Sequence, residues 1–186
     1  MKKTVWTFGL TAGGIMSVVM MLTMPFMDRL GYDHGDTIGY TIGYTTMVVA
    51  FLLVFFGVRS YRDNEGGGTI GFGRALAVGV LIVVVASACY VATWELLYFW
   101  LAPDIGVKFQ AAMLEQARSS AGSPAEVQQK VAEMQRFMQL YRNPLVNSAI
   151  TFLEPLPVGL VLALVSAGIL SRQRRSADAG LAPAAG

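Results

Sequence analysis

Residues 76–100 read LAVGVLIVVVASACYVATWELLYFW, and Glu95 is the one charged residue among them. A helix needs about 20 apolar residues to cross the hydrocarbon core of a bilayer, where every backbone polar group must be bonded within the segment. This stretch is therefore predicted to be a membrane-spanning helix. Three other runs have the same character, since residues 5–24 and 38–58 contain no charge and residues 150–170 contain only Glu154.

The composition agrees with a membrane protein and excludes several other classes. Of the 186 residues, 54% are hydrophobic and 14% are charged, against roughly 45–50% and about 25% in a soluble domain. A net charge of +2 is not the basic excess that nucleic-acid binding requires. Cys89 and His34 are the only residues of their types, so neither an internal disulfide nor a Cys/His zinc set can form. We expect no metal and no cofactor.

The sequence thus predicts an all-α polytopic membrane protein with four transmembrane helices. Residues 1–175 are expected to form a single integral membrane domain, and residues 176–186 a disordered cytoplasmic tail, because that segment is small, polar and without periodicity. The first run exceeds the apolar core of a signal peptide, usually about 7–15 residues, and no small-x-small cleavage site stands before Asp28, so it is interpreted as a retained span.

Orientation follows from the Lys and Arg residues near the span ends, which are enriched on the cytoplasmic side. With both termini inside, eight of the 14 are cytoplasmic, and five of the other six lie in one long segment, where acidic residues partly offset them. The Lys and Arg residues of short loops have the greatest influence on orientation, and here they favour the cytoplasmic side for both termini. Both termini are therefore predicted to be cytoplasmic. Membrane lipids are then the first expected partners.

Residues 104–142, between the third and fourth spans, are predicted to form an extracytoplasmic amphipathic helical hairpin. Ser123, Pro124 and Glu126 form a capping box at the start of its second helix. Apolar residues then recur at steps of 4, 3, 4 and 3, in the stripe Val127, Val131, Met134, Met138 and Tyr141. We favour a hairpin that closes on itself; docking on the bundle, lying in the membrane interface and binding a partner stay open.

Glycines occur in two contexts. The link between the second and third spans contains Gly66, Gly67 and Gly68, which favour a flexible chain reversal over a phosphate loop, since no Gly-Lys-Ser/Thr follows. Small residues four apart let membrane helices approach closely, either within the bundle or in a homo-oligomer. The sets are Gly9 and Gly13; Gly39 and Gly43; and Gly159, Ala163 and Ala167.

Glu95 and Glu154 are the candidate intramembrane polar site. A carboxylate in hydrocarbon is costly, so it usually faces the bundle interior or water and has a partner. Pro155 and Pro157 each disfavour a helical hydrogen bond. Residues 157–170 alone would reach only about 21 Å, short of a core of about 30 Å. A kink or broken helix is therefore expected at residues 154–157. If their role is structural, the two carboxylates are protonated or bonded to Tyr98, Arg142, Thr151 or freed backbone groups.

Four strings resemble a known family, the domain of unknown function (DUF) 4199 family of small bacterial membrane proteins. They are GYTTMVVAFLLVFFGVRSYRDN, GFGRALAVG, CYVATWELLYFWLAPD and YRNPLVNSAITFLEPLPVGL. The resemblance runs from about Gly35 to Arg172 and implies a four-helix protein of the bacterial inner membrane. It implies no activity, cofactor or catalytic residue.

Three interpretations of the carboxylates stay open: structural support of a kinked bundle, a proton or cation site, and acid–base catalysis. We favour a non-enzymatic scaffold or accessory subunit, with the hairpin as its interaction surface. The alternative is a small transporter or proton-coupled carrier that uses Glu95 and Glu154. No enzyme is expected, because no Gly-x-Ser-x-Gly, His-Glu-x-x-His or P-loop pattern occurs. His34 with Asp33 and Asp36 is interpreted as a solvated turn. The aromatic cluster near the outer end of the third span is interpreted as an interfacial belt: Trp94, Tyr98, Phe99 and Trp100.

Overall fold

The computed structural model describes the backbone of residues 1–30, 32–120 and 122–180. It describes their side chains except in residues 24–40, 103, 105, 109 and 172–180. Over these residues the fold is all-α, and four helical segments are long and apolar enough to cross a membrane: Lys2–Thr23, Thr41–Asn64, Phe72–Leu101 and Pro144–Ser171. The predicted fold class is confirmed, and the architecture is that of a multi-pass membrane protein.

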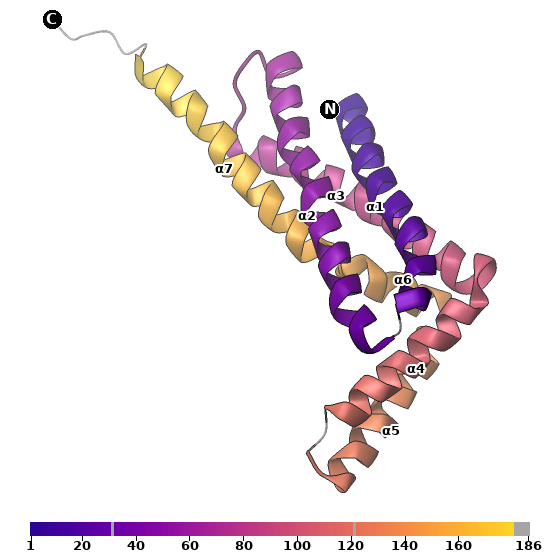
Figure 1. Cartoon of the computed structure of the whole chain (residues 1–186). Coiled ribbons are helices and arrows are strands. Elements are labelled where there is room, and N and C mark those ends of the chain that lie inside the picture. The colour runs from indigo at the N-terminus through magenta and orange to yellow at the C-terminus, as the bar shows by residue number, and fades with distance from the viewer. Residues whose placement is uncertain (31, 121, 181–186) are drawn as a thin grey trace, which may run out of the picture. The chain divides into compact units, whose positions relative to one another are not determined.

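The elements follow one another along the chain as shown in Figure 1. Their bounds are α1 Lys2–Leu30, α2 Tyr32–Asn64, α3 Phe72–Leu96, the π-helical turn η1 Leu97–Leu101, α4 Pro103–Ser119, α5 Pro124–Tyr141, α6 Pro144–Leu153 and α7 Leu156–Gly180. The chain divides into two compact units. Unit 1 combines Met1–Tyr90 with the chain from Pro155 on, and unit 2 is Val91–Glu154.

Unit 1 is held together by small residues that bring its helices close. A Cβ placed on Gly9 would lie 2.7 Å from Cβ of Val85, and one on Gly13 would lie 2.5 Å from Cβ of Cys89. The backbone of α1 at these two glycines therefore packs directly against side chains of α3. On α7, a Cβ on Gly159 would lie 2.4 Å from a methyl of Val83. These glycines therefore serve packing within the chain. Gly43, in contrast, has open space where its Cβ would be.

The surface of unit 1 carries large apolar side chains, while its interior contains many small ones. Ala12, Ala50 and Ala163 are fully buried, whereas Leu22 and Val161 are 61% and 57% exposed. A helix that is apolar on all sides is stable where lipid, not water, surrounds it. This distribution fits the four spans.

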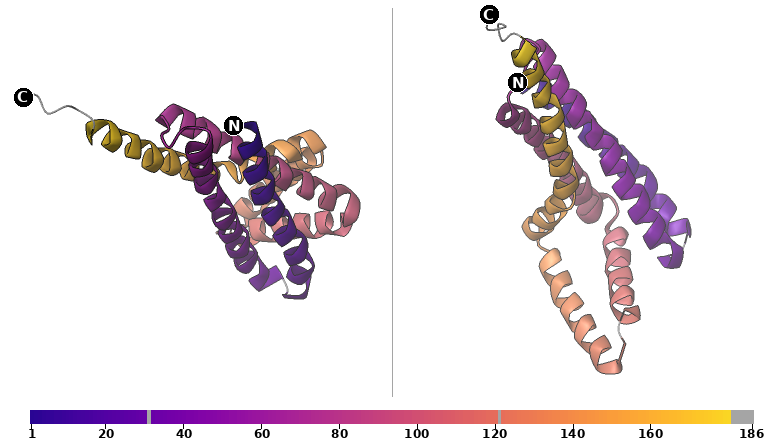
Figure 2. Two further views of the ribbon diagram at one scale, coloured as in Figure 1. Left: turned by 90° about the horizontal axis from the view of Figure 1, so that it is seen from above. Right: turned by 90° about the vertical axis from the view of Figure 1, so that its left-hand side faces the viewer.

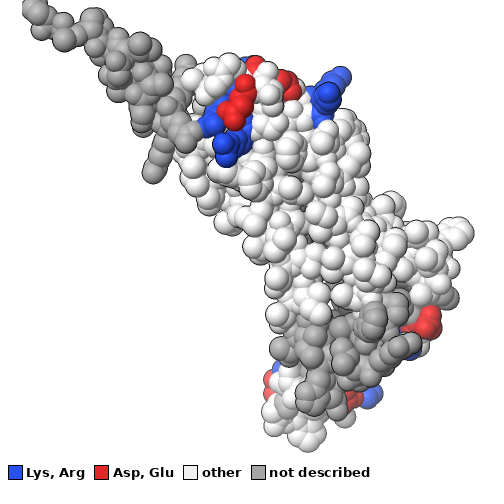
Figure 3. Space-filling model, turned by 45° about the horizontal axis from the view of Figure 1, so that its top comes forward, with Lys and Arg blue, Asp and Glu red and all other residues white. Residues whose placement is uncertain are grey.

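The charged side chains that the structure describes in unit 1 gather beside the link between α2 and α3 (Figure 3). The N-terminal ammonium group pairs with Glu65, which also accepts a hydrogen bond of 2.9 Å from Thr4 Oγ1. The predicted chain reversal is a hydrogen-bonded turn here. Gly67 and Gly68 have φ of 64° and 85°, in the left-handed region that glycine adopts without strain, and the N–H of Gly68 donates to the carbonyl of Arg62 at 3.0 Å.

Unit 2 contains the predicted hairpin, in which α4 and α5 run alongside each other (Figures 1 and 2). Ser123 caps α5 by accepting a hydrogen bond of 3.3 Å from the N–H of Glu126, as the capping box predicts. The carboxylate of Glu126 reaches back to the N–H of Gly122 at 3.0 Å, one residue earlier than expected. The apolar stripe is buried at Met138 and Tyr141 and half-buried nearer the tip. The stripe is thus covered, at least in part, by the hairpin's own packing.

Two predicted boundaries differ from the structure. The solvated turn expected at Asp33, His34 and Asp36 is helical, since these residues lie within α2, which begins at Tyr32; no proline in α2 stops the helix. α7 continues to Gly180 into the segment expected to be a disordered tail, where alanines favour a helix. Residues 181–186 lie outside the described residues, as do the side chains of Asp33, His34 and Asp36.

Candidate functional site

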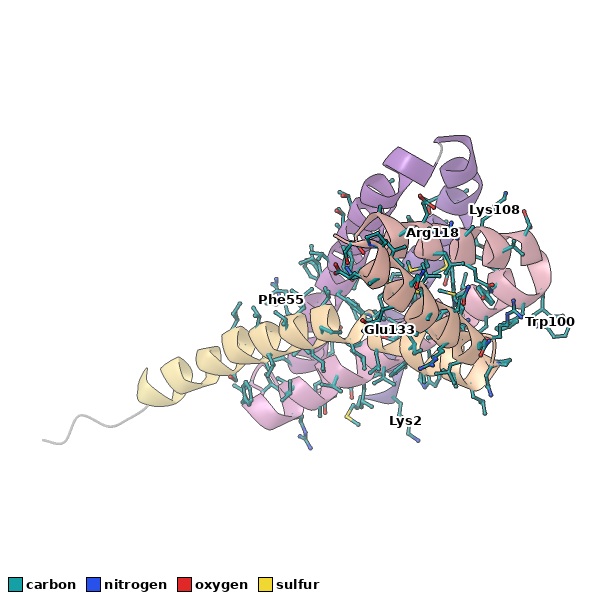
Figure 4. The ribbon with its side chains drawn as sticks, turned by 90° about the horizontal axis from the view of Figure 1, so that it is seen from below. Lys2, Phe55, Trp100, Lys108, Arg118 and Glu133 are labelled. Carbon is teal, nitrogen blue, oxygen red and sulfur yellow. The ribbon has the colours of Figure 1, made fainter. Side chains whose placement is uncertain are left out.

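The candidate polar site lies in unit 2, where the third span changes its helical pitch. α3 gives way at Leu97 to the π-helical turn η1, and Ala102 then leaves the helix with φ of −146°. Single π-helical turns are frequent at functional positions of helices. The turn places Tyr98 inward, 5% exposed, whereas Trp100 is 81% exposed and points away from the ribbon (Figure 4).

Tyr98 is the centre of an aromatic cluster. Its ring centroid lies 5.6 Å from that of Trp94 and 5.7 Å from that of Tyr141, the latter pair edge to face. A Cβ on Gly106 would lie 3.2 Å from the ring of Tyr98, so the missing side chain lets α4 lie against it. The prediction of an interfacial aromatic belt is therefore wrong for Trp94 and Tyr98, which are buried, and Trp100 alone has the exposure that a belt needs.

Glu95 is half-buried and accepts a hydrogen bond of 2.9 Å from Ser148 Oγ on α6. The bond joins the third and fourth predicted spans across 53 residues of sequence. Ser148 was not predicted as a partner, and one hydroxyl is a weak signal in an apolar run. Hydrogen bonds between membrane helices contribute about 0.6 kcal/mol on average and about 1.7 kcal/mol at most.

Tyr98 and Arg142 meet at a residue that the sequence did not single out. Gln110 on α4 donates to the hydroxyl of Tyr98 at 3.1 Å, and its carbonyl oxygen accepts from Arg142 Nη2 at 3.4 Å. Both predicted partners of the carboxylates are thus engaged with the base of the hairpin. Their role in this geometry is to fix α4 against η1 and the end of α5.

A closed ring of hydrogen bonds connects α5 with α6. Thr151 Oγ1 donates to Asn147 Oδ1 at 3.2 Å, so its single proton is used and Tyr141 must donate to Thr151, also at 3.2 Å. Asn147 Nδ2 completes the ring by donating to the backbone carbonyl of Tyr141 at 3.3 Å. All three side chains are buried. Burial raises the pKa of Tyr141, against the opposing effect of its hydrogen bonds to Thr151 and Trp94.

Glu154 lies at a break in the fourth span. α6 ends at Leu153 and α7 begins at Leu156, the place where Pro155 and Pro157 predict an interruption. The side chain of Glu154 is exposed, and Pro155 is fully buried. The hydrogen bonds therefore place Glu95 with Ser148, and Tyr98 and Arg142 with Gln110.

The hairpin carries a groove of about 380 Å³ between α4 and α5. Ala117, Met134 and Phe137 give it an apolar floor, and the polar lining is Gln116, Ser120, Lys130 and Glu133. The α5 members follow the spacing i, i+3, i+4, i+7 of one helix face. Lys130 donates to the carbonyl of Ser120 at 2.7 Å and pairs with Glu126 at 3.2 Å, which ties the two helices together near the tip.

Residues 7–172 match the family described as protein of unknown function (DUF4199). The chain belongs to the DUF4199 family. The match covers the hairpin, the last three spans and most of the first, and confirms the resemblance noted in the four sequence strings. No curated protein and no solved structure matches this DUF4199 protein.

The description of the DUF4199 family assigns no activity, so the roles of residues rest on their chemistry. Within the described part of the chain, no three His, Cys, Asp or Glu residues lie close enough to share a metal ion. Glu95 with Ser148 offers one carboxylate and one hydroxyl, a pair suited to holding a proton or to joining two helices.

Proposed function

We propose that this DUF4199 protein is a non-enzymatic scaffold or accessory subunit of the bacterial inner membrane, with the α4–α5 hairpin as its interaction surface. The supporting observation is the hairpin groove, whose apolar floor of Met134 and Phe137 is only half covered. Amphipathic helices bind such grooves through side chains at i, i+3, i+4 and i+7. The partner that fits is an amphipathic helix with an apolar side chain for this floor.

The hydrogen bonds among the polar residues of unit 2 support the same proposal. Tyr141, Asn147 and Thr151 satisfy one another in the hydrogen-bonded ring, and Gln110 occupies Tyr98 and Arg142. Buried polar groups that are mutually bonded stabilise one arrangement of helices. The orientation proposed with this function has both termini in the cytoplasm, from the distribution of Lys and Arg residues.

Site-specific photo-crosslinking tests the groove. A photoreactive residue at Gln116, which lines the groove, should give one discrete crosslinked product in cells, and one at Arg118 should not. Both side chains are exposed on α4, two residues apart, and only Gln116 belongs to the groove. Peptide mass spectrometry of the product should place the crosslink in an amphipathic helix of the partner.

Two second-site variants make the test specific. Met134→Glu puts a charge on the floor and Glu133→Lys reverses a charge on the rim, and each should reduce the Gln116 product at least several-fold while the melting temperature changes little. Identical products from Gln116 and Arg118, or a product that survives both variants, would refute the proposal.

The second candidate is a small transporter or proton-coupled carrier, favoured by the half-buried Glu95 inside a span. Ionisable residues within spans often mark ion pathways. In proteoliposomes with an imposed pH gradient, Glu95→Gln and Ser148→Ala should then both slow proton entry several-fold. Glu154→Gln tests the second predicted carboxylate, and Glu115→Gln on the exposed face of α4 is the matched control. Equal rates in all variants would reject the carrier.

A further inference from the structure

Between residues 97 and 152 of unit 2, the exposed large apolar side chains that the structure describes are confined to the two ends of the hairpin. On the entering side, Trp100, Leu101 and Val107 are 81%, 64% and 68% exposed, and on the leaving side Leu140 and Leu145 are 61% and 81% exposed. Between residues 108 and 139, none of the large apolar side chains that the structure describes is exposed. We call the five exposed residues the apolar collar.

The position of the collar along the chain gives its depth. Trp100 and Leu101 end the third span, and Leu145 is the second residue of the fourth. Val107 lies four residues after Pro103, where α4 begins, and Leu140 four residues before Pro144, where α6 begins. Four residues correspond to about 6 Å of helix. The headgroup region on each side of the hydrocarbon core is roughly 5–7 Å thick, so Val107 and Leu140 fall within it.

We propose that the base of the hairpin is seated in the lipid interface, with Val107 and Leu140 covered by the boundary between headgroups and acyl chains. Continuity selects lipid as the occupant, since the collar extends the ends of two lipid-crossing segments onto both α4 and α5. Asp104, exposed between Leu101 and Val107, pairs with Lys108 at 3.5 Å. Trp is enriched at this depth of a membrane. The neighbouring cationic residues fit as well: Arg142 is exposed and Lys108 half-buried, and long basic side chains extend their charge to the headgroups while their stems stay apolar.

The proposal is independent of any partner in the groove. It requires that the first turn of α4 and the last turn of α5 lie in the lipid interface. The rest of the hairpin, toward its tip, must lie in water. On α4, Ala111 is one helical turn farther from the span than Val107, and on α5, Arg136 is one turn farther than Leu140. Both Ala111 and Arg136 are exposed. Each collar position therefore has a matched control on its own helix.

Depth-dependent fluorescence quenching tests this placement. Cys89→Ala removes the one native cysteine and keeps the Cβ that packs on Gly13. Single cysteines at Val107, Leu140, Ala111 and Arg136 then receive an environment-sensitive fluorophore in full-length protein. The protein is placed in nanodiscs of phosphatidylcholine and phosphatidylglycerol, with and without phosphatidylcholine spin-labelled near the top of the acyl chain.

We expect at least two-fold quenching and a blue-shifted emission at Val107 and Leu140, with little quenching and water-like emission at Ala111 and Arg136. Water-like emission at all four positions, or equal quenching at all four, would overturn the proposal. Blue-shifted emission without quenching at Val107 and Leu140, accompanied by disulfide-linked dimers of the cysteine variants, would identify a second copy as the occupant and would also overturn it. Melting temperatures equal to that of the Cys89→Ala parent verify that each labelled variant is folded.

Discussion

Gly13 and Gly14 are neighbours on α1 in different surroundings. A Cβ on Gly13 would lie 2.5 Å from Cβ of Cys89 and 3.1 Å from the carbonyl oxygen of Ala86, whereas a Cβ on Gly14 would meet nothing within 4 Å. The same substitution at the two positions therefore separates close packing from helix propensity. It is a residue-scale test of how α1 is held in unit 1.

We predict that Gly13→Ala destabilises the protein by about 1–3 kcal/mol, because α1 must move away from α3 to admit one methyl group. Gly14→Ala should be neutral or stabilising by up to about 1 kcal/mol, since alanine favours the helix. Thermal melting of both variants in the same detergent checks the prediction. Equal melting temperatures for the two would contradict the close contact between α1 and α3.

Tyr141→Phe tests the hydrogen-bonded ring at the level of one hydroxyl. At neutral pH the variant should be less stable by about 1 kcal/mol, within the range measured for such bonds in membrane proteins. Burial raises the pKa of Tyr141 above its ordinary value of 10.0, so the folded protein keeps the phenolic proton longer than the unfolded chain does. The stabilisation that the protonated Tyr141 hydroxyl gives the folded protein is therefore fully present below about pH 10, and it is lost as the pH rises through the folded-state pKa of Tyr141.

The difference in stability between the native protein and Tyr141→Phe should therefore shrink above pH 10. Denaturation at pH 8, 10 and 11 measures it, and Tyr44→Phe, at an exposed tyrosine, is the control. A difference that is constant over this range would show that the hydroxyl is not buried in the folded protein.

At the scale of elements, the capping box decides where α5 begins. Ser123→Ala removes the acceptor for the N–H of Glu126 and should cost about 0.5–2 kcal/mol in the first turn of α5. Amide hydrogen exchange measures the loss, which should appear at residues 125–128 and not in the spans. Ser119→Ala, on an exposed serine at the end of α4, should leave those rates unchanged.

The same turn should weaken in acid. Hydrogen bonds from the N–H of Gly122 and from Lys130 hold the pKa of Glu126 below its ordinary value. A carboxylate with a lowered pKa stabilises the turn above its unfolded-state pKa, and this contribution disappears as the pH falls through the folded-state value.

Elements that depend on local chemistry could be predicted from the sequence. The start of α5 follows from Ser123 and Pro124, and the break after Leu153 follows from Pro155 and Pro157. Each of these signals acts within a few residues, so no knowledge of the rest of the fold is needed.

The partners of the polar residues could not be predicted in this way. Glu95 and Ser148 are 53 residues apart, and Gln110 joins Tyr98 to Arg142 only because η1 turns the chain back on itself. These bonds depend on the packing of several elements at once. The ring was missed although a signal existed, since Asn147 and Thr151 are four residues apart in an otherwise apolar helix and so share one face.

At the scale of the whole molecule, the proposed orientation can be tested with the cysteine-free Cys89→Ala protein. Thr69 and Gln128 are exposed, in the link between α2 and α3 and in the hairpin respectively. In spheroplasts, a membrane-impermeant maleimide should label Gln128→Cys directly and Thr69→Cys only after permeabilisation. The reverse pattern would invert the topology, and direct labelling of both would contradict the crossing of the third span.

The interruption of the fourth span also bears on how the protein is made. α6 has 10 residues, about 15 Å of helix, and the described part of α7 within the span adds about 24 Å, so neither half crosses a core of about 30 Å alone. The translocon must therefore insert α6 and α7 together, with Glu154 at their junction. A charged residue near the middle of the membrane costs about 2.5–3.5 kcal/mol on insertion. During biosynthesis the fourth span therefore depends most on helices that are already in the bilayer. Deleting the earlier spans should prevent the fourth span from inserting into the membrane.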